Sequence, residues 1–105
     1  MKQLALCLAL LGACTTAEST GIATVSCPTD STLTFTNFGA TFMENNCLSC
    51  HQTRESPKLA TQAQIQAHAA AILDQAVYTT AMPEDTDMTI AEREKLGEWI
   101  ACGAP

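Results

Sequence analysis

Six of the 105 residues are cysteines, and their spacing divides them into three pairs with different consequences for the fold. The pairs are Cys7 with Cys14, Cys47 with Cys50, and Cys27 with Cys102. The first pair lies in an apolar N-terminal stretch, the second forms one short motif, and the third brackets the remaining chain. The first pair therefore bears on export, the second on local chemistry, and the third on closure of the domain.

The N-terminal stretch predicts an export signal. After Lys2, an apolar run is too short to span a bilayer as a mature helix. It ends in Leu11-Gly12-Ala13-Cys14, which resembles the lipobox of bacterial lipoproteins, where the cysteine is acylated. We expect residues 1–14 to be a signal peptide and a lipid on Cys14 to hold the protein at the periplasmic face of a bacterial membrane. An ordinary signal peptide, cut for instance after Ala17, is the alternative and would leave a periplasmic protein.

The remaining chain, about 90 residues long, is expected to form one small domain over 27–105. The small polar residues 15–26 predict a flexible tether ahead of it. A domain of this size benefits from a covalent staple or a cofactor. Export favours a disulfide between Cys27 and Cys102, which would close a long loop, with two buried free thiols as the alternative.

The charge of the chain limits its partners. Without the leader, four basic residues stand against eleven acidic ones, a net charge of −7. That sign argues against a nucleic-acid partner, because nucleic acids are bound through their phosphates. A protein partner with a basic docking surface, or simple periplasmic solubility, agrees better with it.

Helical periodicity and capping signals predict an all-α fold of about three helices with irregular loops. The expected ranges are 37–49, 62–77 and 90–102. The second and third begin with the spacing of a capping box, Thr61 with Gln64 and Thr89 with Glu92. No convincing pair of strands accompanies them.

The first expected helix, capped by Thr36 or Asn37, carries a glycine in its apolar pattern. Gly39, Met43 and Cys47 follow one another at four-residue steps and share one side of the helix. Because glycine destabilises a helix interior, close approach of another helix is the expected reason for Gly39. A later start of the helix is the alternative.

The motif Cys47-Leu48-Ser49-Cys50-His51 carries the chemistry of the chain. Two thiols at this spacing can each form a thioether with one vinyl group of a haem, and the histidine that follows can bind the iron. The motif predicts one covalently attached haem c. A thioredoxin-like motif would need a βαβ context, and a zinc site would need two further ligands.

A second iron ligand is expected from the loop after the second helix. Met82, stiffened by Pro83, is the first candidate, because a thioether opposite an imidazole favours Fe(II) and raises the potential. Met88 on the same loop is an alternative. Met43 is expected in the core, and His68 lies in the middle of the second helix. An open, five-coordinate site also stays possible.

Three further residues are candidates for supporting roles. Arg54 can pair with a haem propionate, or it can be a solvated surface arginine. The carbonyl of Pro57 or of a neighbour can accept the Nδ1 proton of His51 and fix its tautomer. Trp99 is expected in the core, with the haem edge as the alternative.

These residues resemble the class I cytochrome c family over most of the chain, from Thr34 to Gly103. In that family a glycine and an apolar residue precede the haem motif at four-residue steps, a C-terminal helix crosses that first helix, and a loop methionine binds iron. The matching residues here are Gly39, Met43 and Cys47 for the steps, Leu96, Trp99 and Ile100 for the crossing helix, and Met82 with Pro83 for the loop. The resemblance implies a small cytochrome c fold that transfers electrons and is not an enzyme.

The chain also departs from that family. Met43 stands where an aromatic residue is usual, the stretch between His51 and Met82 is short, and a pair such as Cys27 and Cys102 is not a general feature. Two segments are similar to small cytochrome-like lipoproteins of myxobacterial type; they are 33–39 and 98–105.

The predicted function is outer-sphere transfer of single electrons to and from redox protein partners. No Ser/His/Asp set or paired-carboxylate site is evident in the sequence. A haem enzyme or gas sensor with an open distal position is the main alternative. A structural lipoprotein whose Cys-x-x-Cys-His motif is incidental is the third.

Overall fold

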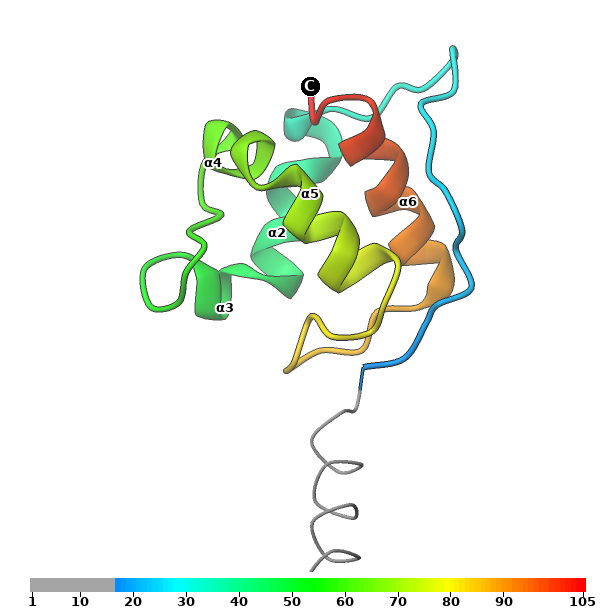
Figure 1. The fold of residues 1–105 in the computed structure, drawn as a ribbon. Coiled ribbons are helices and arrows are strands. Elements are labelled where there is room, and N and C mark those ends of the chain that lie inside the picture. The colour runs from blue at the N-terminus through cyan, green and yellow to red at the C-terminus, as the bar shows by residue number, and fades with distance from the viewer. Residues whose placement is uncertain (1–16) are drawn as a thin grey trace, which may run out of the picture.

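The computed structural model describes residues 17–105, which fold into helices joined by irregular loops (Figure 1). The expected all-α class is confirmed for this range, whose β structure is limited to an isolated bridge between Ser19 and Thr79. None of its helices is long and apolar enough to cross a membrane. The predicted signal peptide 1–14 and its lipidation candidate Cys14 lie outside the described residues.

The described chain has two π-helical turns and five α-helices. They are the turns η1 (Phe35–Gly39) and η2 (Leu73–Val77) and the α-helices α2 (Ala40–Asn46), α3 (Leu48–His51), α4 (Gln62–Ala67), α5 (Ala69–Ile72) and α6 (Ile90–Ala101).

Two of the expected helices begin where their capping signals predicted. Thr61 and Gln64 form a capping box at the start of α4, and Thr89 and Glu92 form one at the start of α6. In each box the threonine hydroxyl accepts a main-chain N–H, and the longer side chain accepts the N–H of the threonine. The second expected helix is nevertheless divided, because His68 leaves helical geometry between α4 and α5.

The first expected helix begins earlier than residue 37, because its cap is Thr34 and not Thr36 or Asn37. The Thr34 hydroxyl accepts the Asn37 N–H at 3.0 Å, and Asn37 Oδ1 accepts the Thr34 N–H at 2.7 Å. Asn37 therefore closes a capping box from inside the helix. The helical stretch continues through η1, α2 and α3 and is interrupted at Cys47, where φ is −128°.

Gly39 is the point at which this first helical stretch packs against α6. Gly39 is buried, and a Cβ atom added to it would overlap the ring of Trp99. Trp99 is itself fully buried, and its ring meets that of Phe38 edge-on with centroids 5.7 Å apart. The predicted close approach of another helix is therefore the reason for this glycine, and Trp99 belongs to the core.

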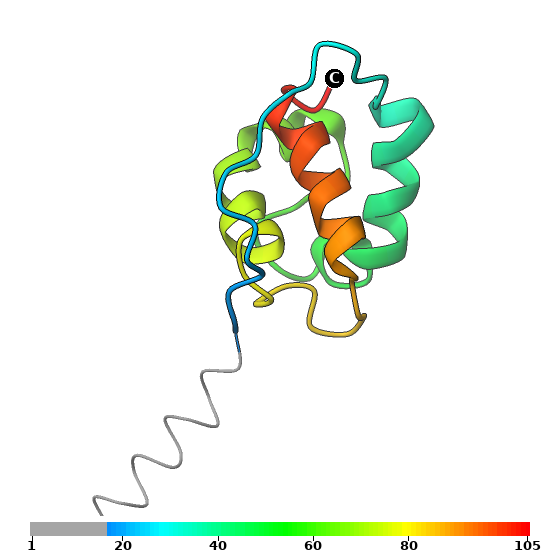
Figure 2. The same cartoon turned by 90° about the vertical axis from the view of Figure 1, so that its right-hand side faces the viewer.

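The core lies between three helical stretches, with α6 flanked by η1–α2 on one side and by α5–η2 on the other (Figure 2). The expectation that Met43 belongs to the core is confirmed, since only 1% of its surface is exposed. The buried apolar side chains form one cluster: Phe42, Met43, Leu59, Ile65, Ile72, Ala76, Val77, Met88, Leu96, Trp99, Ile100 and Ala104.

The expected disulfide between Cys27 and Cys102 is present, with the two Cα atoms 4.7 Å apart across 75 residues of sequence. It joins the segment before the first helix to the end of α6. The chain beyond α6 is tied to α4 as well, because the Ala104 carbonyl accepts hydrogen bonds from the side-chain amides of Gln62 and Gln66 at 3.0 and 3.1 Å.

The segment 15–26, expected to be a flexible tether, is packed against the domain over its described part. It runs beside η2 and α6 in both views (Figures 1 and 2). The Thr20 N–H donates to the Tyr78 carbonyl at 3.0 Å, and the apolar side chains of Ile22 and Val25 pack against the core. The segment packs because these two side chains bury apolar surface that a free tether would expose. The sequence did not predict this packing, because two apolar residues are too few to show a period.

We expect Gly39→Ala to destabilise the fold by about 1–3 kcal/mol, because the added methyl group overpacks the contact with Trp99. In an exposed helix the same change would stabilise by about 1 kcal/mol. Thr41→Ala, at an exposed position of α2, is the matched control and should change stability by less than about 0.5 kcal/mol. Urea unfolding measures both, and a Gly39→Ala protein as stable as the parent would contradict the packing argument.

Candidate functional site

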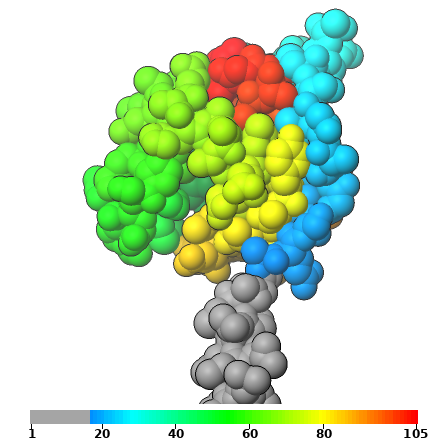
Figure 3. Space-filling view, viewed as in Figure 1, coloured from blue at the N-terminus to red at the C-terminus, as the bar shows by residue number. Residues whose placement is uncertain are grey.

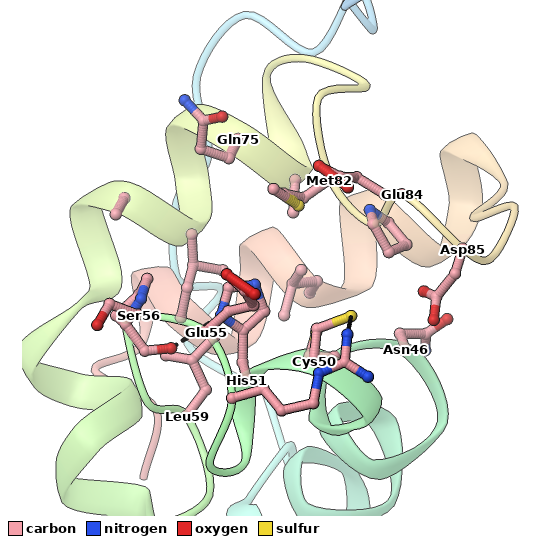
Figure 4. A pocket seen from close by; sticks show the side chains of 18 residues that line it. Asn46, Cys50, His51, Glu55, Ser56, Leu59, Gln75, Met82, Glu84 and Asp85 are labelled. Atoms are coloured by element: carbon pink, nitrogen blue, oxygen red, sulfur yellow. Dashed lines mark hydrogen bonds between the residues drawn. The ribbon is translucent and has the colours of Figure 1, made fainter.

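A cavity of about 470 Å³ opens between the region of α3 and the loop that follows η2. Figure 3 shows a hollow between the green and the yellow to orange parts of the surface, and Figure 4 shows the side chains around the cavity. The inner wall is apolar, with Leu59, Ile72, Ala76 and Leu96. The rim is charged and polar, with Asn46, Arg54, Glu55, Glu84 and Asp85.

His51 lies at the end of α3 and lines this cavity. Its Nδ1 is 2.8 Å from the Pro57 carbonyl oxygen, the contact that the sequence predicted. Because a carbonyl can only accept, the neutral imidazole carries its proton on Nδ1 in this hydrogen bond, and its Nε2 is then free to bind a metal. The Leu59 N–H also donates to the His51 carbonyl at 2.8 Å. The imidazole is therefore held in the tautomer that a metal ligand needs.

Cys47 and Cys50 line the same cavity as His51, and both are free thiols. Burial raises the pKa of the Cys47 thiol to about 11, and the nearby Asp85 carboxylate adds to the rise. At Cys50 the neighbour has the opposite charge, since Arg54 Nη2 is 3.7 Å from its sulfur. Cys47 is therefore protonated at neutral pH, and the two thiols have different surroundings.

Met82 lies across the cavity from His51 (Figure 4). The other candidate ligands are placed elsewhere. Met88 and Met43 are buried in the core, and His68 lines an adjoining, more open hollow and not the cavity itself. Of the candidates considered from the sequence, Met82 is therefore the one that shares a cavity with His51.

Sequence reasoning missed Arg93, which supports the Met82 loop from α6. Only 4% of its surface is exposed, and its Nη1 donates to the carbonyls of Ala76, Thr79 and Met82. One signal was present: Arg93 stands three residues before Leu96, on the apolar side of the helix predicted over 90–102. A charged residue in that position needs internal partners, although the sequence does not show which ones.

Two side-chain hydrogen bonds, also missed from the sequence, connect the two walls of the cavity at its rim. The Ser49 hydroxyl donates to the Asp85 carboxylate at 2.7 Å, and the Thr86 hydroxyl donates to Oδ1 of the Asn46 side chain at 3.3 Å. Arg54 lies at the rim and is exposed, which agrees with either of the roles considered for it. The loop after Met82 is thus tied to the segment that carries the two thiols.

We expect the Cys47 thiol to be alkylated slowly at neutral pH and faster as the pH rises toward about 11, because the thiolate is the reactive form. Asp85→Asn removes one cause of the raised pKa and should move this profile to lower pH. Glu55→Gln, another carboxylate at the rim, is the control and should leave it unchanged. Iodoacetamide labelling of the haem-free protein in a Cys50→Ser background, followed by mass spectrometry, gives the rates. A half-maximal rate at or below the ordinary value of 9.0 would contradict the assignment.

Comparison with known proteins adds no assignment to this site. No family model, curated protein or solved structure matches the chain. The function is therefore inferred from the residues of the cavity and their geometry.

Proposed function

We propose that this chain is a monohaem c-type cytochrome of the class I type, which carries single electrons through one covalently attached haem. The observation that supports it is the placement of Cys47, Cys50 and His51 in one cavity with Met82 across from the histidine. Two thiols, a proximal imidazole and a distal thioether are the protein groups that such a carrier uses. The resemblance of the sequence to the class I family adds to this placement.

The residues around the cavity fit a haem. A volume of about 470 Å³ lies within the range of sites for small molecules and cofactors. The apolar inner wall suits the macrocycle, and a rim arginine such as Arg54 suits a propionate. When bound, the haem supplies an iron that alternates between Fe(II) and Fe(III).

Each side chain then has a distinct task. The sulfur atoms of Cys47 and Cys50 hold the macrocycle as thioethers. His51 binds iron through Nε2, while the Pro57 carbonyl keeps the ring in place through Nδ1. The Met82 sulfur would be the second ligand of the iron and would favour its reduced form. The apolar wall limits the access of water and raises the potential further.

Other uses of a Cys-x-x-Cys pair fit the geometry less well. A structural zinc site has four ligands, and over 17–105 no group of three or more His, Cys, Asp or Glu side chains converges as a metal site would require. A thioredoxin-like motif belongs to a βαβ unit, whereas this pair lies at the break between α2 and α3.

Optical spectra of the oxidised and reduced protein, produced with a haem-attachment system, test the proposal. We expect a low-spin c-type spectrum with the weak band that reports a bond between sulfur and Fe(III). Met82→Leu should abolish this band because it removes the ligand, and Met88→Leu should retain it because Met88 lies in the core. Both changes nearly conserve side-chain volume, so they form a matched pair.

Two results would contradict the proposal in different ways. A high-spin wild-type protein that binds carbon monoxide readily would indicate an open distal site, and with it a haem enzyme or gas sensor. A chain that attaches no haem would refute the cytochrome assignment altogether.

We also propose that the protein is exported, is anchored through Cys14, and exchanges electrons with redox proteins that have a basic docking surface. The charge of the cavity rim supports the last point. Glu55, Glu84 and Asp85 are exposed there, and Arg54 is the basic residue among them. Complementary charge of this kind increases the rate of encounter between partners.

Small redox reagents of opposite charge measure this effect directly. We expect a cationic reagent to react faster than an anionic one at low ionic strength, and the difference to shrink above about 0.1 M salt. Glu84→Gln, at the rim, should reduce the preference more than Glu94→Gln, which removes an exposed carboxylate of α6 away from the cavity. Rates that do not depend on salt for either reagent would exclude steering by the rim.

A further inference from the structure

Arg93 is the one buried charged side chain among residues 17–105, with 4% of its surface exposed. A guanidinium stays protonated at every pH that a protein tolerates. Burial of such a charge is unfavourable unless hydrogen bonds compensate for the water that is lost. The hydrogen-bond partners of Arg93 therefore indicate which part of the fold the buried guanidinium stabilises.

All of these partners belong to one short segment of main chain. Nη1 of Arg93 is 2.8 Å from the Ala76 carbonyl oxygen, 3.3 Å from that of Thr79 and 2.7 Å from that of Met82. The three carbonyls begin in η2 and end at Met82, so one nitrogen atom holds both ends of the loop between them. The loop cannot move away from α6 without losing these hydrogen bonds.

The peptide units on both sides of the Met82 Cα are anchored. Its N–H donates to the Gln75 carbonyl at 2.7 Å, and its own carbonyl accepts from Arg93. Because both peptide units are held, the Cα–Cβ bond of Met82 keeps one direction. The side chain therefore stays at the wall of the cavity. A flexible methionine side chain gains most from such support, because its own torsions specify its position poorly.

The charge of Arg93 is balanced only weakly. Its hydrogen-bond partners in the described chain are neutral carbonyls, and the carboxylate that interacts with it, that of Glu92, is exposed to solvent. A positive charge therefore lies one peptide unit from the Met82 side chain. Such a charge disfavours the oxidised iron relative to the reduced iron.

We propose that Arg93 is the positioning residue that keeps Met82 in place as the distal iron ligand. The inference rests on the proposed function, because it needs a haem iron opposite His51. Arg93 does not line the cavity, so it would touch neither the iron nor the haem. It acts through the Met82 carbonyl, so its loss weakens the hold of the protein on the ligand.

The haem-loaded protein provides the first test, with Arg93→Gln compared with Lys95→Gln. Both variants lose one positive charge from α6, but Lys95 is exposed and its ammonium lies over the Phe38 ring, 5.2 Å from the centroid. The pH is raised until the sulfur-to-iron band disappears. In Arg93→Gln we expect this loss at a pH about one unit lower than in the wild type, because a hydrogen bond to a charged group is lost. The reduced form should bind carbon monoxide about ten-fold more tightly, and the reduction potential should fall.

A second test does not need the haem. The Met82 N–H is hydrogen-bonded to Gln75, so its hydrogen exchange reports opening of the loop in the haem-free protein. Arg93→Gln should increase this exchange relative to amides of the core around Leu96, whereas Lys95→Gln should not. Faster exchange everywhere would show a general loss of stability and would contradict a positioning role.

The outcomes separate this inference from the proposed function. If the wild-type protein attaches no haem or lacks the sulfur-to-iron band, the proposed function fails, and the exchange test still shows whether Arg93 holds the loop. If the band is present and Arg93→Gln matches Lys95→Gln in band loss and carbon monoxide binding, the positioning role is overturned. If Arg93→Gln does not fold, Arg93→Lys decides: a band-loss pH below that of both the wild type and Lys95→Gln is expected, and one equal to that of Lys95→Gln overturns the role.

Discussion

The contact between Gly39 and the ring of Trp99 sets how closely the first helical stretch approaches α6, and the cavity depends on that distance. A side chain larger than hydrogen at residue 39 would overlap the indole, so the two helices would have to move apart. The first stretch carries both thiols and His51, and α6 carries the arginine that holds the Met82 loop. The separation of the two walls therefore follows from a packing contact that lies outside the cavity.

Helix α6 serves as the common support of the domain. Near its N-terminus, Arg93 holds the loop after η2. At its C-terminus, the disulfide from Cys102 and the hydrogen bonds of the Ala104 carbonyl hold the N-terminal segment and α4. A small domain with a modest core gains stability when one element closes several long loops in this way. The arrangement also explains why the segment before Cys27 is packed: Val25 fits against the surface of Gly97.

Main-chain groups do most of the positioning at the cavity. The Pro57 carbonyl orients His51, and the Gln75 and Met82 carbonyls fix the methionine loop. Side chains add charge: burial, and after it the Asp85 carboxylate, raise the pKa of the Cys47 thiol. These main-chain contacts restrict the positions of His51 and Met82, two side chains whose own torsions would leave them freer.

The sequence by itself determined the features that depend on residues a few positions apart. The capping boxes at Thr61 and Thr89 and the spacing of Cys47, Cys50 and His51 are of this kind. The tertiary structure decided the rest. Thr34, Thr36 and Asn37 could each cap the first helix, and Thr34 does so. Beside this cap, the Phe35 N–H donates to the Pro105 carbonyl at the other end of the domain. The placement of Met82 at the cavity and of Met88 in the core, and the hydrogen bonds of Arg93, depend on where main-chain carbonyls meet after the helices have packed. Such meeting points leave no periodic signal, because a carbonyl is present at every residue whatever its side chain.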